Sequence, residues 1–445
     1  MTPASARVDQ THRDTADPPH PWHPVSRVVF RFCFVYFGLF CLVFAQIMFV
    51  YTGIFRLWLP DLAVMWQMIL IERPISWVGT HLLGIDAVLH HDSNSGDQAA
   101  VWVMVLCFAV IALTATAIWT VLDHRRPDYR RLNAWFLTFL RLCLGGQMLF
   151  YGLAKLIPTQ MPLPPLAALL RPVGDLSPAS VLWLQVGSSP TYQIALGAAE
   201  TVAGLLLFLP RTATLGAVLS LASMGQVFLL NMTYDVPVKI LSSHLLLISL
   251  ILVAPQLRRL ADVFVLHKPA EPLTQPELFA SSRRNRIAAL VQVVLGVWVL
   301  AGCVATTWLA WYEYGGGRPR PELYGIWSVS DFTVDGTTLP PLTSDPTRWQ
   351  RVVFDEVGVL TYQRMDGELI DAPAAIDGDT LTVAAPDGTA PEATLRFDRD
   401  SPDTMRFDGE LDGRPVTMTL QRVDPASFTL NSRGFHWVQE YPYFT

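Results

Sequence analysis

The chain has 445 residues, of which 51% are apolar and only 16% are charged. Soluble proteins carry about 25% charged residues, so this composition argues against intrinsic disorder and against an ordinary soluble enzyme. The formal net charge is −6, and no basic surface for nucleic acid is indicated. The five cysteines lie in apolar segments without a C-x-x-C pair, so neither a disulfide framework nor a metal site is predicted.

The first 27 residues are rich in proline and are predicted to form a flexible tail. The first apolar segment after this tail has no small-residue cleavage site behind it, which favours an uncleaved span over a signal peptide. A bilayer is crossed by roughly 17–25 apolar residues. Segments of this kind are found at about 28–50, 99–121, 133–157, 192–209, 212–231, 237–254 and 287–312.

Arginine and lysine gather in the tail and in the loops that follow the second, fourth and sixth predicted spans. Because basic loops stay in the cytoplasm, the sequence predicts a cytoplasmic N-terminus and a C-terminal region outside the cell membrane. The expected location is therefore the bacterial inner membrane, with several crossings. The lipid bilayer is the first predicted partner.

Two apolar stretches between the spans are too interrupted to cross. Residues 61–91 contain Pro74 and are predicted to form two interfacial or re-entrant helices on the outer face. Residues 158–191 contain seven prolines, which forbid a long helix and predict a stiff, ordered cover over the helical bundle.

From about residue 320 the pattern changes to alternating apolar and polar residues. Asp-Gly pairs, which suit tight hairpin turns, begin at Asp335, Asp366, Asp377, Asp387, Asp408 and Asp412. Frequent turns between alternating segments predict an antiparallel all-β domain over residues 320–445. The Gly325-Ile326-Trp327 start favours a lipocalin-like barrel plugged by the tryptophan, and a sandwich is the alternative.

Ionisable side chains inside predicted spans are costly and usually serve pairing or function. Arg141 and Lys155 are fourteen residues apart, so they share one face of the third span, with Tyr151 one turn from Lys155. Gly145 and Gly152 on the same span predict a groove that another helix can approach.

Glu200 lies between Gly197 and Gly204 in the fourth span, and this small-residue face predicts a buried carboxylate. Asp235 and Lys239 are one helical turn apart at the start of the sixth span. Together with neighbouring polar residues they are expected to line one cavity in the outer half of the bundle. The candidate ligand-binding residues are Arg141, Tyr151, Lys155, Glu200, Asn231, Asp235, Lys239 and His244.

Two interpretations of this cluster remain open at the level of the sequence. The charges could bind an anionic or quinone-like headgroup or relay protons. Alternatively, Lys155–Glu200 and Asp235–Lys239 could be structural pairs that only fix the register of the helices. No residue is assigned a catalytic role, and whether the protein is an enzyme stays open.

Three sequence blocks resemble the DoxX-like membrane family. They are YGLAKL (151–156), GAAETVAGLLLFLPRTATLGA (197–217) and LVAPQLRRL (252–260). The whole chain is similar to a long bacterial subgroup of that family with an added C-terminal soluble β domain. The blocks that carry this similarity are SGDQAAVWV (95–103), LNMTYDVPVKILSSHLL (230–246) and NSRGFHWVQEYP (431–442).

The resemblance implies a four-helix core formed by the third to sixth spans. Some relatives are membrane subunits associated with thiosulfate oxidation and quinone reduction, or partners of redox and thiol-stress enzymes. The chain departs from a complete oxidoreductase, because it has no cofactor motif and no paired cysteines. If electrons pass through it, quinone or a membrane or periplasmic redox partner must carry them.

The sequence thus predicts an α-helical polytopic membrane protein with about seven spans, a DoxX-like core and a C-terminal all-β domain. Its divisions are 1–27, 28–130, 131–260, 261–286, 287–312 and 320–445. The first functional hypothesis is a quinone- or lipid-headgroup-binding subunit of a membrane redox complex. The alternative is a non-enzymatic transporter or an assembly or scaffold protein that holds a small anionic metabolite or lipid.

Overall fold

A computed structural model describes residues 21–273, 275, 277–385 and 391–444. Residues 1–20 of the predicted tail, and Asp387, lie outside the described residues. Within the described part, seven helices are long and apolar enough to cross a membrane, which confirms the helical membrane prediction. They are α1 Pro24–Val43, α3 Ala99–Leu122, α4 Arg130–Leu156, α6 Pro190–Phe208, α7 Ala213–Thr233, α8 Lys239–Val253 with its continuation to Phe264, and α10 Ser282–Glu313.

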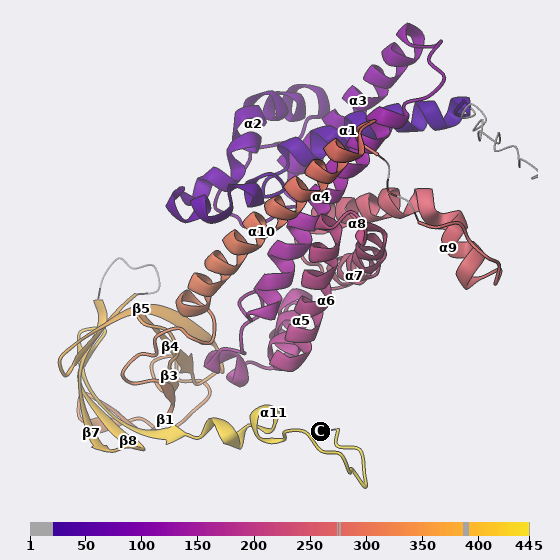
Figure 1. Cartoon of the computed structure of the whole chain (residues 1–445). Helices are drawn as coiled ribbons and strands as arrows, with labels where there is room; N and C mark the ends of the chain where they lie inside the picture. Colours follow the sequence, from indigo (N-terminus) through magenta and orange to yellow (C-terminus); the bar gives the residue numbers. More distant parts are fainter. Residues whose placement is uncertain (1–20, 274, 276, 386–390, 445) are drawn as a thin grey trace, which may run out of the picture.

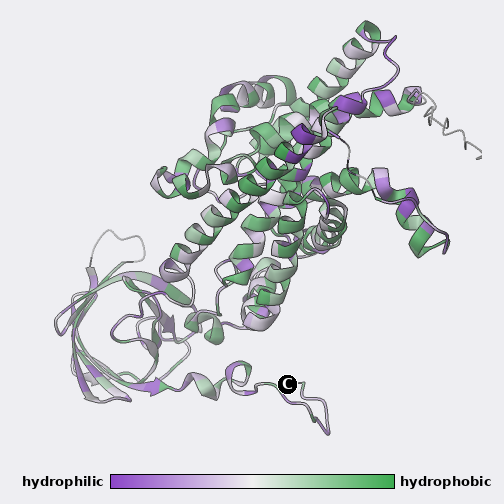
Figure 2. Cartoon of the chain, viewed as in Figure 1, coloured by the Kyte–Doolittle hydropathy of each residue, from purple (hydrophilic) through white to green (hydrophobic). Residues whose placement is uncertain are grey.

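The helices form one bundle, and the β domain lies at one end of it, beyond the C-terminus of α10 (Figure 1). We call this the barrel-side end. Figure 2 shows apolar residues along the bundle and more polar ones in the β domain and in the loops. Apolar helices suit a bilayer because all their backbone hydrogen bonds are made internally.

The first span is shorter than predicted and is followed by a reversal of the chain. Helix α1 ends at Val43, Phe44 is extended, and Gln46 has a φ of 75°. The chain then forms the 3-10 helix η1 Phe49–Trp58 against α10. Gly53 in η1 has a φ of 57°, and a Cβ there would lie 2.2 Å from the ring of Trp298. Only glycine allows this close packing.

The two segments between spans are both ordered. In place of two helices over 61–91, there is the 3-10 turn η2 Asp61–Met65, helix α2 Trp66–Val78 and the π-turn η3 Gly79–Leu83. Helix α2 continues through Pro74, although a proline inside a helix removes one backbone hydrogen bond. Residues 158–191, the covering loop, contain η4 Leu166–Leu170, η5 Val173–Asp175 and the short helix α5 Pro178–Gly187.

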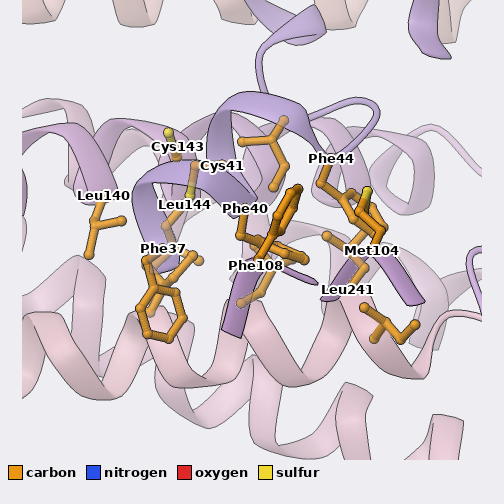
Figure 3. Packing of buried hydrophobic residues seen from close by; sticks show 14 of the residues in the cluster. Phe37, Phe40, Cys41, Phe44, Met104, Phe108, Leu140, Cys143, Leu144 and Leu241 are labelled. Carbon is orange, nitrogen blue, oxygen red and sulfur yellow. The ribbon is translucent and has the colours of Figure 1, made fainter. Parts of the chain in front are cut away.

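The bundle has an aromatic and aliphatic core between α1, α3, α4 and α8 (Figure 3). Phe40 and Cys41 of α1, Leu140 and Leu144 of α4 and Ile248 of α8 are each completely buried. Because the bilayer offers no hydrophobic drive for helix association, such tight packing is what holds spans together.

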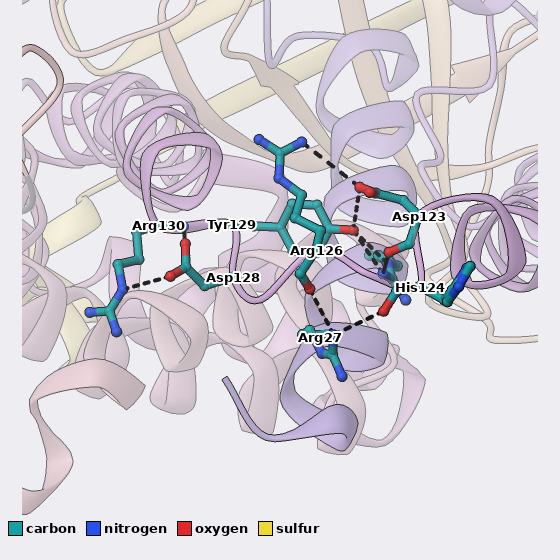
Figure 4. A network of polar contacts seen from close by, with 8 residues as sticks. Arg27, Asp123, His124, Arg126, Asp128, Tyr129 and Arg130 are labelled. Carbon is teal, nitrogen blue, oxygen red and sulfur yellow. Dashed lines mark hydrogen bonds and ion pairs between the residues drawn. The ribbon is translucent and has the colours of Figure 1, made fainter. Parts of the chain in front are cut away.

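A polar network closes the end of the bundle opposite the barrel (Figure 4). Arg31 of α1 is buried and donates to the Tyr129 hydroxyl at 2.8 Å and to the Thr120 hydroxyl at 2.8 Å. Tyr129 in turn donates to Asp123 Oδ2 at 2.8 Å. This hydrogen bond, the largest of several causes, lowers the pKa of Asp123 below its usual value. The network ties α1 to the α3–α4 loop.

The C-terminal domain is a closed eight-stranded antiparallel barrel. Strand β1 Gly325–Val334 pairs with both β3 and β9, and every other barrel strand pairs with its neighbours in sequence. The short β2 Thr337–Thr338 extends β1. The remaining strands are β3 Trp349–Phe354, β4 Val359–Arg364, β5 Leu369–Asp377, β6 Thr380–Ala384, β7 Pro391–Ser401, β8 Thr404–Leu411 and β9 Arg414–Val423. Closure decides between the two predicted architectures in favour of the barrel.

The buried Trp327 belongs to the interior core of the barrel. Its Nε1 donates to the Leu323 carbonyl at 2.9 Å. Asp335 and Asp412 occupy hairpin turns with positive φ, as predicted. The prediction of a turn at Asp408-Gly409 is wrong, because both residues lie inside β8. A Cβ on Gly409 would lie 2.1 Å from the Thr394 carbonyl oxygen, so close approach of strands explains this glycine.

The barrel is fastened to the covering loop by apolar and polar contacts. Ile326 and Val353, on the outside of the barrel, form a buried cluster with Leu166 of η4. The Leu166 backbone N–H donates to Asp355 Oδ2 at 2.9 Å, and Arg318 forms an ion pair with the same carboxylate at 2.8 Å. The barrel therefore rests on the loop that covers the bundle.

Candidate functional site

The site is built where α4 and α6 pack against each other through glycine. A Cβ on Gly197 would lie 2.3 Å from the Leu156 nitrogen, and one on Gly152 would lie 2.6 Å from the Thr201 nitrogen. The two backbones are thus in contact, as the small-residue spacing predicted. This proximity sets Lys155 of α4 beside the middle of α6.

Lys155 and Glu200 form an ion pair inside the bundle. The distance from Lys155 Nζ to Glu200 Oε2 is 2.7 Å, and the two side chains are only 8% and 4% exposed. Tyr151, one turn earlier, presents its ring to the ammonium at 5.8 Å from the ring centroid. A buried charge needs such compensation, because it has lost its hydration shell.

Gln46 supports the site from the break after α1, and nothing in the sequence had indicated it. The Tyr151 hydroxyl donates to Gln46 Oε1 at 3.0 Å, and Gln147 Nε2 donates to the Gln46 carbonyl at 3.2 Å. These bonds fix Tyr151 on the side of Lys155. Gln46 reaches this position because its backbone adopts a positive φ, which the sequence of a non-glycine residue does not reveal.

Two small cavities adjoin the ion pair. Their volumes are about 60 and 50 Å³, and Lys155, Gln160 and Asn231 line both. The first cavity also touches Glu200 and the inner face of α5. The second reaches Tyr151 and the first turns of α8. Lys155 therefore lies between two cavities and is not packed against other side chains on all sides.

Two polar atoms on these cavities have no hydrogen-bond partner among the described residues. They are the donor Asn231 Nδ2 and the acceptor Gln160 Oε1. Asn231 is only 6% exposed. A buried donor or acceptor without a partner costs roughly 1–3 kcal/mol, so such groups normally face something that satisfies them. Here both atoms belong to side chains that line the cavities beside a buried cation.

Asp235 and Lys239 lie at the barrel-side end rather than on these cavities. Their ion pair measures 2.8 Å, and the Asp235 side chain is 82% exposed. Asp97, from the α3 entry, accepts the backbone N–H groups of Lys239 and Ile240 at 2.8 and 2.9 Å. This carboxylate caps the start of α8. The group ties the start of α8 to the segment that precedes α3.

His244 faces α1 and not Lys155. Its Nδ1 lies 2.7 Å from the Ile240 carbonyl oxygen and is therefore the protonated nitrogen. Its Nε2 then accepts from the Tyr36 hydroxyl at 2.8 Å, and the ring stacks on Phe40 at 3.8 Å between centroids. Both ring nitrogens are satisfied within the core.

Arg141 lies toward the opposite end and is hydrogen bonded to Gln292 of α10. It lines a separate cavity of about 240 Å³ together with Gln256 and Arg259. Of the eight predicted site residues, four line the two small cavities: Tyr151, Lys155, Glu200 and Asn231. The structure does not bring the other four to these cavities.

A larger cavity of about 550 Å³ lies between the covering loop and the barrel. It is lined by Trp183 of α5, Arg171, and by Glu356 and Asp371 of the barrel, among others. Trp183 also lines the first small cavity, so a single side chain is common to both spaces. The sequence could not predict this cavity, since it depends on how the barrel docks.

Comparison with known proteins finds a bacterial relative. The chain is 30% identical over 133 residues to "Uncharacterized protein YwoB" of Bacillus subtilis (strain 168), which covers 28% of this chain and 79% of that protein. No protein-family model matches the chain. No solved structure matches it either.

Proposed function

We propose that this chain, which belongs to the same protein family as YwoB of Bacillus subtilis, is a membrane protein that binds the polar headgroup of a quinone or a lipid. The observation that carries the proposal is the pair of unpartnered atoms, Asn231 Nδ2 and Gln160 Oε1, beside the buried Lys155–Glu200 pair. Membership of a redox complex rests on the DoxX-like resemblance and stays a prediction.

The donor set suits an oxygen-rich headgroup at the edge of an apolar molecule. Lys155 has three N–H donors, of which Glu200 takes one at 2.7 Å, and Asn231 adds another donor. A quinone carbonyl or a phosphate ester oxygen accepts from both. Gln160 Oε1 accepts in return, so the hydroxyl of a reduced quinone also finds a partner.

The lining also suits a molecule that arrives from the lipid. Apart from the polar groups, the cavities are lined by apolar side chains, among them Val227, Leu196, Leu245 and Met224. Lys155, Gln160, Val227 and Asn231 belong to both linings, so the two cavities adjoin each other. Ligand sites are commonly apolar with a few convergent polar groups.

We place this site in the outer half of the bilayer and the barrel in the periplasm. The support is the position of the basic residues of the helical part, most of which lie in the loops and helix ends opposite the barrel. Examples are Arg125, Arg126, Arg130, Arg131, Arg211, Arg258, Arg259, Arg283, Arg284 and Arg286.

The test is ligand retention and binding by the purified full chain. Asn231→Leu removes the unpartnered donor and fills the space while leaving the ion pair intact. We expect it to lose co-purifying quinone or lipid and to weaken binding of added decylubiquinone or phosphatidylglycerol about tenfold, the equivalent of one hydrogen bond. Asp235→Ala, at the exposed pair, is the matched control and should bind normally.

A purely structural role of the ion pair is the competing interpretation, favoured by the close match of Lys155 and Glu200 at 2.7 Å. In that case Asn231→Leu raises stability and changes neither the bound lipid nor the affinity for either probe. That result would refute the proposal. Loss of only one of the two probes would identify the ligand class.

A further inference from the structure

The residues after the barrel form an exposed aromatic segment. Strand β9 ends at Val423, and the turn η7 Pro425–Ser427 and helix α11 Thr429–Ser432 follow. Beyond α11, five large apolar side chains within ten residues are at least 75% exposed: Phe435, Trp437, Val438, Tyr441 and Phe444. Single exposed apolar residues are common on proteins, but a dense group of them marks an interaction site.

The segment starts at the membrane side of the barrel. Phe428 packs on the buried cluster of Leu166, Ile326 and Val353, where the barrel rests on the covering loop. From there the chain runs beyond α5, at the barrel-side end of the bundle (Figure 1). The aromatic segment therefore lies at the same end of the bundle as the barrel.

The same end of the bundle carries other exposed aromatic residues. Trp308, Tyr312 and Tyr314, in the last turns of α10 and directly after it, are each about half exposed. Tryptophan and tyrosine prefer the level of the lipid headgroups, where the ring is apolar and its polar atom stays hydrated. These residues mark the bilayer surface, and the aromatic segment lies on the same side.

The segment has almost no charge with which to attract a polar partner. Residues 429–444 contain one base, Arg433, and one acid, Glu440. Arg433 lies over the ring of Tyr443 at 4.9 Å from its centroid and contacts His436. Phe435 and Trp437 form an edge-to-face pair at 5.0 Å. The exposed surface of the segment is therefore mainly aromatic and carries little charge.

We propose that residues 434–444 insert their aromatic side chains into the headgroup region of the bilayer that holds the seven spans. The barrel then has two attachments to the membrane part: the covering loop on one side and this segment on the other. Because the segment has no net charge, its insertion depends on ring burial and not on anionic lipid.

The test places an environment-sensitive fluorophore at Val438→Cys in the full chain, reconstituted in phosphatidylcholine nanodiscs. We expect brominated lipid to quench the label, and high salt or added anionic lipid to leave the quenching unchanged. Thr337→Cys, exposed on β2, is the matched site that should not be quenched. The native cysteines all lie in spans, so the unsubstituted protein gives the labelling background.

A second variant keeps the result interpretable. Replacing Phe435, Trp437 and Phe444 with serine should abolish quenching at position 438 while the labelled barrel site behaves as before. An unquenched label in the otherwise native segment would overturn the proposal. So would energy transfer between labelled copies without lipid quenching, since the segment would then bind a second copy of the chain.

Discussion

Replacing Glu200 with glutamine tests whether the ion pair inside the bundle holds the spans together. With 2.7 Å between Lys155 Nζ and Glu200 Oε2 and an effective dielectric constant of about 20, the attraction is about 6 kcal/mol. Much of this offsets the cost of burying both charges. Removing one partner leaves the other charge uncompensated, so Glu200→Gln should lower the unfolding free energy by about 3–5 kcal/mol.

The double substitution distinguishes the loss of stability that an unpaired charge causes from the loss that disturbed packing causes. Lys155→Met combined with Glu200→Gln removes both charges, and most of the lost stability should return. Unfolding free energies in lipid bicelles, measured for the native chain, both single variants and the double variant, give the coupling energy. Asp235→Asn, at the exposed carboxylate of the second ion pair, should cost less than about 1 kcal/mol and serves as the control.

Two results would refute this reasoning. One is a double variant as unstable as Glu200→Gln alone, which would mean that the loss arises from packing and not from an uncompensated charge. The other is a single variant within about 0.5 kcal/mol of the native chain. Water reaching the ammonium through the two cavities would then be sufficient compensation.

Three further predictions follow from other parts of the structure. Gly197→Ala inserts a Cβ 2.3 Å from the α4 backbone and should cost about 1–3 kcal/mol in unfolding free energy, whereas Gly225→Ala, with nothing within 4 Å, should be neutral. Tyr129→Phe removes the main cause of the lowered pKa of Asp123. Because the pKa of Asp123 is lower in the folded than in the unfolded chain, the ionised carboxylate stabilises the fold at pH values above the unfolded pKa. This stabilisation is lost as the pH falls through the folded pKa. The variant should therefore melt at a lower temperature at neutral pH and show a flatter loss of stability on acidification; unchanged melting curves would contradict this. Asp355→Ala removes the carboxylate that joins the barrel to the covering loop, so hydrogen exchange in the loop should accelerate while the barrel strands stay protected.

The spans and the barrel domain were predictable because each rests on local pattern. Apolar length marks a span, and Asp-Gly pairs between alternating segments mark hairpins. The pattern failed at Asp408-Gly409, where glycine is required by a neighbouring strand and not by a turn. The break after Val43 was also hidden, since it depends on the backbone conformation of Gln46.

The sequence predicted only the part of the candidate site that depends on the spacing of small residues along helices. Small residues predicted a groove on the third span and an inward-packing face on the fourth. In the structure these two helices pack on each other, and the contact of Lys155 with Glu200 follows from it. His244 lies on a predicted span, but helical periodicity does not say which neighbour a side chain faces. Gln160 and Trp183 come from the covering loop, whose path no periodic pattern describes.

The closure of the barrel has a consequence for a protein confined to a membrane. Proteins in a bilayer meet one another often, and an open sheet would offer its unpaired edge to every copy it met. Because β1 hydrogen bonds to β9 as well as to β3, no strand of the described barrel has a free long edge. A protein that binds this domain must therefore contact its side chains, because no long strand edge is free for backbone hydrogen bonds. For the same reason, neighbouring copies in one membrane have no free edge through which their sheets could join.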